Sequence, residues 1–473
     1  MSTSASEGLP LTVDHYTYKG EAVAYLQQNE NKLKVILSSG VPGDEVRAVL
    51  GRKRRGSCQG FIKEIIRPSP LRTVPRCRHV PLCGGCAWQE MDYAAQLATK
   101  QQWVAKLFSD ALSPRTVLHP ILGCMDPWRY RNKMEFSFSQ DAQGTRYLGL
   151  MLRGSRGKVF NLLECHLTST WFANAVQATR SWWESSSLLA YHPHRNTGSL
   201  RTLTLREGRH TGSKMAILTI SGQPEFALSR PQMLQWAKAL SATAPKDQPI
   251  SCFIRIQQAI KGQPTQFYEI HLSGPEFLLE ELHLDTQANL APLTLQISPQ
   301  SFFQPNTLQA EVLYSRALAL AKPDPDAHIL DLYCGTATIG MAFARCVQQV
   351  TAIELNPYAI LDAEANCARN QLENIRLLKG DAGEKLAEVL QEGSRPFDLI
   401  IVDPPRTGLG PKALQTVLQA HAPRLLYIAC NPLTQAEEVK TLLAHGYRLE
   451  AIQPVDQFPH TPHLENIALL SRP

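Results

Sequence analysis

The stretch HILDLYCGTATIGMAFA, residues 328–344, decides the fold class of this chain. It combines an apolar strand at 329–332, a turn of small residues and the start of a helix. Further apolar strands follow and alternate with helical patterns: VTAIEL, IRLLKGD, FDLIIVDPP, RLLYIAC and YRLEAIQPV. Strands that alternate with helices predict an open, mostly parallel sheet with helices on both faces.

Acidic residues stand where these strands end. Glu354 lies about 20 residues beyond the first turn, the spacing of an acid that accepts ribose hydroxyls. Asp381 and Asp403 end the next two strands, and such ends meet in one crevice where ligands bind. The turn GTATIG, residues 335–340, departs from the G-x-G-x-x-G of dinucleotide sites, so the smaller nucleoside ligand S-adenosylmethionine is favoured. The alternative, that each acid only caps a helix, explains the whole set less well.

Two later motifs carry further candidates for chemistry. YIACNP, residues 427–432, ends a fifth strand with Cys430, on the face where ligands bind in such sheets. A small buried core residue is the alternative for this cysteine. HTPHLENIALL, residues 460–470, places Glu465 just before a final apolar strand.

The first part of the chain has a different pattern. Residues 10–68 read as short strands broken by Gly, Pro and Asp turns, which predicts a small antiparallel barrel. From residue 51 to residue 80 there are nine Lys or Arg against one acid, within a chain of net charge +6. Such a segment suits nucleic-acid phosphates, with a merely solvated basic surface as the alternative. Residues 125–290 mix strand-like runs, such as KVFNLLE, with one aromatic helix and predict an α+β domain.

The compartment follows from what the sequence lacks. The start MSTSASEG has no basic and apolar signal pattern, and no run of about 18 apolar residues occurs. A cytoplasmic protein without a membrane segment is therefore expected. In a reducing compartment, the group Cys77, Cys83 and Cys86 indicates a metal site or a catalytic group rather than disulfides.

Taken together, the motifs resemble those of the S-adenosylmethionine-dependent RNA uridine C5-methyltransferases, which form 5-methyluridine in tRNA and 23S rRNA. The motifs that carry the resemblance are QISPQSFFQPN, DLYCGTATIG, AIELNP, IIVDPPRTGL, YIACNP and HTPHLENIALL. The resemblance implies a multi-domain α/β protein: a TRAM-like β-barrel over 1–70, a central α+β domain with an iron–sulfur segment over 71–300, and a Rossmann-like methyltransferase domain over 301–473.

The resemblance also assigns roles. Cys430 becomes the nucleophile that adds to uracil carbon 6, and Glu465 the base that removes the proton from carbon 5. Asp403 lines the pocket and orients one or both. The cofactor-binding residues implied are Gln304, Tyr333, Thr338, Glu354, Asp381 and Asp403. The chain departs from the family pattern at Ala337, usually Gly, and at Thr338, often Asn, and a methyl group at 337 is expected to shift the cofactor loop.

By the same resemblance the cysteine group holds a [4Fe-4S] cluster. Cys77, Cys83 and Cys86 form C-x5-C-x2-C, close to a ferredoxin-like spacing, and Cys165 matches the distant fourth ligand. Zinc could use the same four thiolates, so both occupants stay open. His79 is expected at the surface.

RNA is the implied partner, with 23S rRNA favoured over tRNA, and the enzyme is expected to act as a monomer. The target uridine must leave its stack, and Phe302 and Phe303 are candidates to fill the gap, with core packing the alternative for one of them. WRYRNKMEFSF, residues 128–138, offers Arg129, Arg131, Asn132 and Lys133 for RNA contact.

Two other functions compete with this interpretation. A non-catalytic RNA-binding protein that keeps the scaffold is disfavoured by the intact Cys430, Glu465 and Asp403. An adenine amino-methyltransferase is disfavoured because Arg406 follows the two prolines where those enzymes carry an aromatic residue, and because it would leave Cys430 unexplained.

Overall fold

The computed structural model describes residues 8–28, 31–54, 56–155, 157–260, 262–285, 290–393 and 395–472. An N-terminal barrel closes in the order β1-β2-β3-β5-β4. Its strands are β1 (Leu9–Tyr16), β2 (Ala22–Gln28), β3 (Asn31–Leu37), β4 (Glu45–Arg54) and β5 (Ser57–Arg67). All its pairs are antiparallel except β3 with β5, which run parallel, so the expectation of a purely antiparallel barrel was wrong in this one pair.

A six-stranded sheet forms the centre of the chain, in the order β12-β11-β10-β9-β7-β8. The strands are β7 (Lys133–Gln140), β8 (Arg146–Gly149), β9 (Leu200–Glu207), β10 (Lys214–Ser221), β11 (Ile250–Gln258) and β12 (Gln266–Ser273). Helices α2 (Thr170–Glu184) and α3 (Arg230–Ser241) share one core cluster with this sheet. Along β10, Ala216 and Leu218 enter that cluster, whereas Met215 and Ile217 enter the C-terminal core. The alternation shows that β10, in the middle of the sheet, is buried on both faces.

The C-terminal sheet has eight strands in the order β17-β16-β15-β18-β19-β21-β20-β6. Its bounds are β6 (Val117–Leu118), β15 (His328–Leu332), β16 (Gln349–Glu354), β17 (Ile375–Lys379), β18 (Leu399–Val402), β19 (Arg424–Ala429), β20 (Arg448–Val455) and β21 (Glu465–Ser471). The strands from β17 to β19 are parallel, and β21 runs antiparallel between β19 and β20. This arrangement confirms the predicted open, mostly parallel sheet.

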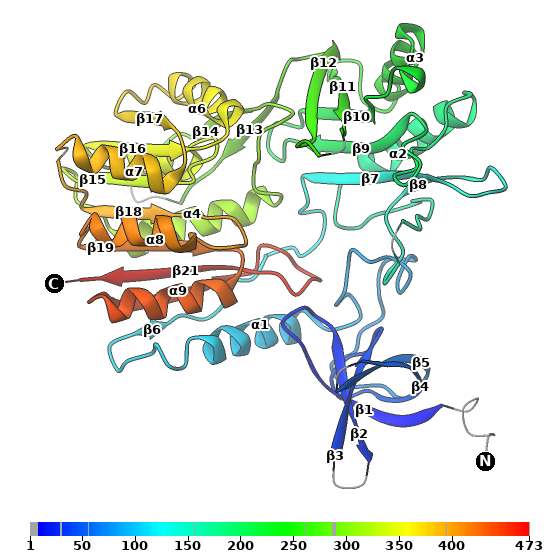
Figure 1. The fold of residues 1–473 in the computed structure, drawn as a ribbon, viewed down its shortest axis with the longest axis horizontal. Helices are drawn as coiled ribbons and strands as arrows, with labels where there is room; N and C mark the ends of the chain where they lie inside the picture. The colour runs from blue at the N-terminus through cyan, green and yellow to red at the C-terminus, as the bar shows by residue number, and fades with distance from the viewer. Residues whose placement is uncertain are drawn as a thin grey trace.

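Two core clusters cover the two faces of the C-terminal sheet. One face packs against α4 (Thr307–Ala321), α5 (Thr338–Ala344) and α6 (Pro357–Arg369), beside the hairpin β13 (Leu278–Leu282) and β14 (Leu293–Ile297). The other face packs against α7 (Ala382–Gln391), α8 (Gly410–Gln419), α9 (Pro432–Ala444) and α1 (Tyr93–Leu107). Helix α1 and strand β6 therefore come from the segment before the central sheet and complete the far edge of the C-terminal layer (Figure 1).

The carboxyl ends of the parallel strands point toward the barrel and the central sheet, because the start of antiparallel β21 lies on that side (Figure 1). Any ligand site at these strand ends is thus bordered by all three parts of the chain. The run KVFNLLE, residues 158–164, expected as a strand, forms an isolated bridge between Val159 and Met151 and backbone hydrogen bonds from Phe160 to Leu150 and from Leu162 to Leu148, but no regular strand, so that expectation was wrong. Among the described residues, no helix combines the length and apolar character needed to cross a membrane.

Candidate active site

Asp403 and Cys430 stand at neighbouring strand ends. Strand β18 stops at Val402 and β19 at Ala429, so Asp403 and Cys430 are the first residues beyond each strand. Because β18 and β19 are adjacent and parallel, with Val402 beside Tyr427, both side chains lie at the same edge of the sheet.

Glu465 reaches this edge from the opposite direction. Strand β21 is antiparallel to β19, and the last paired residues are Ala429 and Asn466. One further step along this register sets Glu465 opposite Cys430. Gln435 of α9 fixes the two ends, because its side-chain amide donates to the carbonyls of Tyr427 (2.9 Å) and Asn466 (3.2 Å).

The pKa values of all three groups are raised. Glu465 is 2% exposed, and its Oε2 has no hydrogen-bond partner within the described residues. Burial, and then the charge of Asp403, raise the pKa of Glu465 well above its ordinary range. Burial raises the pKa of Asp403 to about 7, and burial with Glu465 and Asp403 raises the pKa of the Cys430 thiol to about 11. The positive charge of Arg406 lowers the pKa of both Cys430 and Glu465. A carboxyl whose pKa is raised toward neutrality is suited to general-base work.

The first turn of the C-terminal sheet opens toward the same edge. Tyr333, Gly335 and Ala337 have φ of 62°, 56° and 59°, and no atom lies within 4 Å of where a Cβ on Gly335 would stand. Glu354 at the end of β16 holds the turn, since its carboxylate accepts from the backbone N–H of Gly335 (3.0 Å) and of Asn356 (2.7 Å). A rigid turn with free space above it suits close approach of a ligand.

Ala337 does not line this open space. Its side chain is 0% exposed and belongs to the core cluster, so its methyl group packs inward. The departure from Gly therefore costs left-handed backbone strain, on the order of 1 kcal/mol, rather than contact with a ligand. Thr338 begins α5, and its hydroxyl pairs with that of Thr336 at 3.0 Å.

The other expected cofactor residues differ in their surroundings. Asp381 is the N-cap of α7, and its Oδ1 accepts from the backbone N–H of Gly383 (3.0 Å) and Glu384 (3.1 Å). Capping is therefore part of its role, and both capping bonds use one carboxylate oxygen. Gln304 is buried, and its carbonyl accepts from the Asn132 side chain at 2.9 Å, which joins the motif FFQPN to the central domain.

Sequence reasoning missed two buried groups beside these acids. Tyr314 of α4 has a pKa raised well above its ordinary value, first by burial and then by Asp403, Glu465 and Asp331. Asp331 lies inside the opening stretch and is 0% exposed, with Gly340 of α5 beside its carboxylate. Burial, and then the charge of Asp403, raise the pKa of Asp331 to about 8. An acidic residue in the middle of the apolar run ILDL was the sequence signal that could have identified Asp331.

The four expected metal ligands line one cavity of about 500 Å³, although Cys165 is far from the others in sequence. All four are free thiols, and burial raises the pKa of each, to about 12 for Cys86. Within the described ranges, no three His, Cys, Asp or Glu side chains are spaced to hold a metal ion. His79 is buried rather than at the surface, with Nε2 facing the backbone N–H of Leu163 at 3.2 Å, so that expectation was wrong.

Known proteins with similar sequences are RNA methyltransferases. The family model described as tRNA (uracil-5-)-methyltransferase matches residues 274–473. An uncharacterized RNA methyltransferase from Protochlamydia amoebophila is 45% identical, covering 92% of this chain and 99% of the relative. One from Clostridium tetani is 31% identical, covering 98% and 97%.

A solved structure shares the fold. The tRNA (uracil-54, C5)-methyltransferase of Pyrococcus abyssi, in complex with S-adenosyl-L-homocysteine, superposes with a TM-score of 0.69. It covers 98% of this chain and 100% of its own length at 22% identity. The chain therefore belongs to the RNA methyltransferases, and its residues 274–473 match the model of the tRNA (uracil-5-)-methyltransferase family.

Proposed function

We propose that this enzyme methylates carbon 5 of a specific uridine in 23S rRNA through a covalent intermediate on Cys430. The observation that carries the proposal is the antiparallel register of β19 and β21, which sets Glu465 opposite Cys430 with Asp403 beside them. A nucleophile and a base at one strand edge supply the two groups that the reaction needs.

Carbon 5 of uracil is a poor nucleophile until a thiolate adds to carbon 6. Cys430 forms this bond and turns the ring into an enolate. S-adenosylmethionine, when bound, would supply the electrophilic methyl group that carbon 5 takes, and its sulfur–methyl bond would break to leave S-adenosylhomocysteine. Glu465 then removes the proton from carbon 5, the bond between carbon 6 and Cys430 breaks, and the thiolate leaves as the ring double bond returns. Asp403 lines the pocket beside Cys430 and Glu465 and orients one or both of them.

Glu354 and Asp381 would hold S-adenosylmethionine at the opening above the first turn by accepting from its hydroxyl and amino groups, and Asp381 keeps one carboxylate oxygen outside its capping bonds. Tyr333, Thr338 and Gln304 complete the set, together with Asp403.

The cysteine cavity holds a [4Fe-4S] cluster in our proposal. Four thiols with raised pKa values around one cavity are stabilised as thiolates by a bound metal. A bound cluster would cross-link the segment of Cys77, Cys83 and Cys86 to Cys165. Iron and acid-labile sulfide in anaerobically purified protein test this directly, and stoichiometric zinc would overturn it.

RNA recognition is assigned to the first two units, the barrel of residues 1–70 and the central domain of 71–300, with 301–473 as the catalytic unit. The basic segment supports this only in part. Arg72 is held in an ion pair with buried Asp44 at 2.6 Å, whereas Arg52 and Lys53 are exposed. Arg55 lies outside the described residues. We further propose that the protein is cytoplasmic, which the eleven free cysteines support, and that it acts as a monomer.

The test is transfer of labelled methyl groups to matched 23S rRNA and tRNA transcripts, with Cys430→Ala as the paired control. Labelling of 23S rRNA at one uridine, lost in Cys430→Ala, is the expected result. Labelling of tRNA alone would select the alternative substrate, which the description of the matching family model favours. If the cofactor binds but neither RNA is labelled, the proposal fails in favour of a non-catalytic RNA-binding protein.

A further inference from the structure

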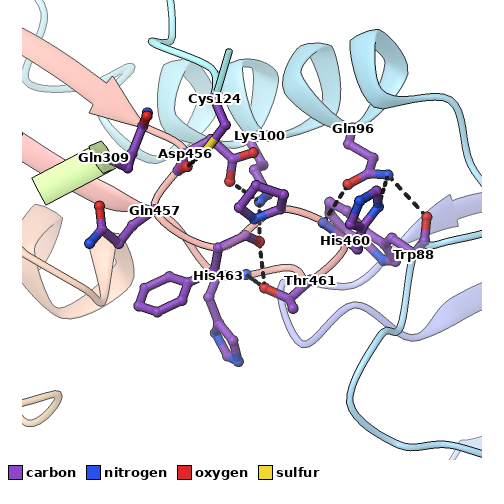
Figure 2. Close-up of polar contacts among 12 residues, drawn as sticks. Trp88, Gln96, Lys100, Cys124, Gln309, Asp456, Gln457, His460, Thr461 and His463 are labelled. Atoms are coloured by element: carbon purple, nitrogen blue, oxygen red, sulfur yellow. Dashed lines mark hydrogen bonds and ion pairs between the residues drawn. The ribbon is translucent and has the colours of Figure 1, made fainter. Parts of the chain in front are cut away.

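The loop between β20 and β21, residues 456–464, leads directly into Glu465. Helix α1 holds this loop at two points, although the contacting residues are 356 and 364 positions apart in the sequence. Figure 2 shows the labelled side chains of Gln96 and Lys100 reaching from the helix to Asp456 and His460 of the loop. We call these contacts the α1 clamp.

The first point of the clamp is an ion pair. Lys100 Nζ lies 2.5 Å from Asp456 Oδ1, and both side chains are 0% exposed. Lys100 also donates to the carbonyl of Phe458 at 3.2 Å, and the Tyr93 hydroxyl donates to Asp456 Oδ2 at 2.8 Å. The start of the loop thus has several fixed bonds to one helix.

The second point is an amide contact. Gln96 Oε1 accepts from the backbone N–H of His460 at 2.8 Å, while Gln96 Nε2 lies 3.2 Å from His460 Nδ1. His460 has a φ of 64°, and Trp128 stacks on its ring at 4.0 Å between centroids. A non-glycine residue keeps such a conformation only where its surroundings enforce it, so the loop has one defined path.

A buried ion pair is a poor way to gain stability, since desolvation offsets most of the attraction. Its clear effect is geometric, because only one arrangement satisfies both charges. Such geometric control matters for Glu465. Its Oε2 has no hydrogen-bond partner within the described residues, and its side chain is only 2% exposed. The position of its carboxylate therefore depends on the backbone at the start of β21, which is held on one side by the pairing of Glu465 with Val455 and on the other by the loop that leads into it.

We infer that Lys100 and Gln96 are positioning residues that aim Glu465 at carbon 5 of the bound uridine. The inference rests on the proposed function. Loss of the clamp then slows proton abstraction, the last step, far more than attack by Cys430 or methyl transfer, which come before it. A misplaced base would leave the RNA methylated and still bonded to Cys430.

The test uses Gln96→Leu and the double variant Lys100→Met/Asp456→Asn, which removes both charges together and keeps an acceptor for Tyr93. Lys106→Met, on the exposed face of the same helix, is the matched control. Single-turnover reactions with labelled S-adenosylmethionine follow two signals: the methylated protein–RNA adduct that survives denaturation, and the free methylated RNA. Melting temperatures report whether each variant is folded.

In the clamp variants we expect adduct formation within about threefold of wild type, but release slowed about 10- to 100-fold, so that methylated adduct accumulates. Lys106→Met should behave as wild type. Folded variants in which both steps slow equally, or in which neither changes, would overturn the inference. Failure of the proposed function is distinguishable, because wild-type protein would then form neither adduct nor product.

Discussion

Replacing Lys100 by Met removes the cation from a fully buried ion pair and leaves Asp456 with the Tyr93 hydroxyl as its remaining side-chain donor among the described residues. Breaking a buried pair by removing one partner costs about 3–5 kcal/mol, because an uncompensated charge stays in a dry site. For a cooperative unit of about 200 residues this lowers the melting temperature by on the order of 10 °C. The double variant Lys100→Met/Asp456→Asn leaves no buried charge and should recover most of that loss.

A double-mutant cycle measured by thermal and urea unfolding gives the coupling directly. The cycle consists of wild type, Lys100→Met, Asp456→Asn and the double variant. We expect each single variant to be strongly destabilised and the double variant to lie within about 2 kcal/mol of wild type. Single variants that each cost less than about 1 kcal/mol would refute the reasoning, since the pair would then be solvated and could not fix the loop.

Three further predictions concern other groups. The pKa of Cys430 at about 11 means that its thiolate fraction rises about tenfold per pH unit, so adduct formation should accelerate from about pH 6.5 to about pH 9; a flat profile in rapid-quench assays would contradict this. Burial raises the pKa of Asp331 to about 8, so the stability that it contributes is present below about pH 4 and lost as pH rises through about 8. The melting temperature of Asp331→Asn should therefore rise above that of wild type progressively from about pH 4 to about pH 8. An equal difference between the two proteins at both pH values would contradict this prediction. Phe303 is 8% exposed and lies in the core, so Phe303→Ala should lower the free energy of unfolding by about 3–5 kcal/mol. Phe302 is 63% exposed, so Phe302→Ala should weaken RNA affinity in filter binding without changing the melting temperature.

The C-terminal sheet was predictable because its strands are continuous apolar runs separated by helical patterns. The strand ends then located Glu354, Asp403 and Cys430 at one edge, as found. KVFNLLE, residues 158–164, does run beside residues 148–152, to which Phe160 and Leu162 donate backbone hydrogen bonds, but the pairing is irregular and gives one isolated bridge, Val159 with Met151. Local pattern does not report whether a pairing is regular enough to make a strand.

The placement of Glu465 opposite Cys430 depends on register across an antiparallel pair, which no local pattern specifies. The burial of Lys100 was also beyond prediction, because a lysine on an amphipathic helix is ordinarily exposed. Only the fold brings Asp456 to it. That Cys165 lines the same cavity as the other three cysteines was predicted from the family resemblance alone. Spacing along the chain does not identify a ligand that is distant in sequence.

The central claim is that Cys430 bonds to carbon 6 of the target uridine. The most direct measurement incubates wild-type protein and Cys430→Ala with S-adenosylmethionine and RNA that contains 5-fluorouridine, and then maps any stable adduct by mass spectrometry. Fluorine at carbon 5 cannot leave as a proton, so the account predicts a trapped adduct on the peptide that contains Cys430, absent in Cys430→Ala. An adduct on another cysteine, or methylation of normal RNA without any trapped adduct, would contradict it.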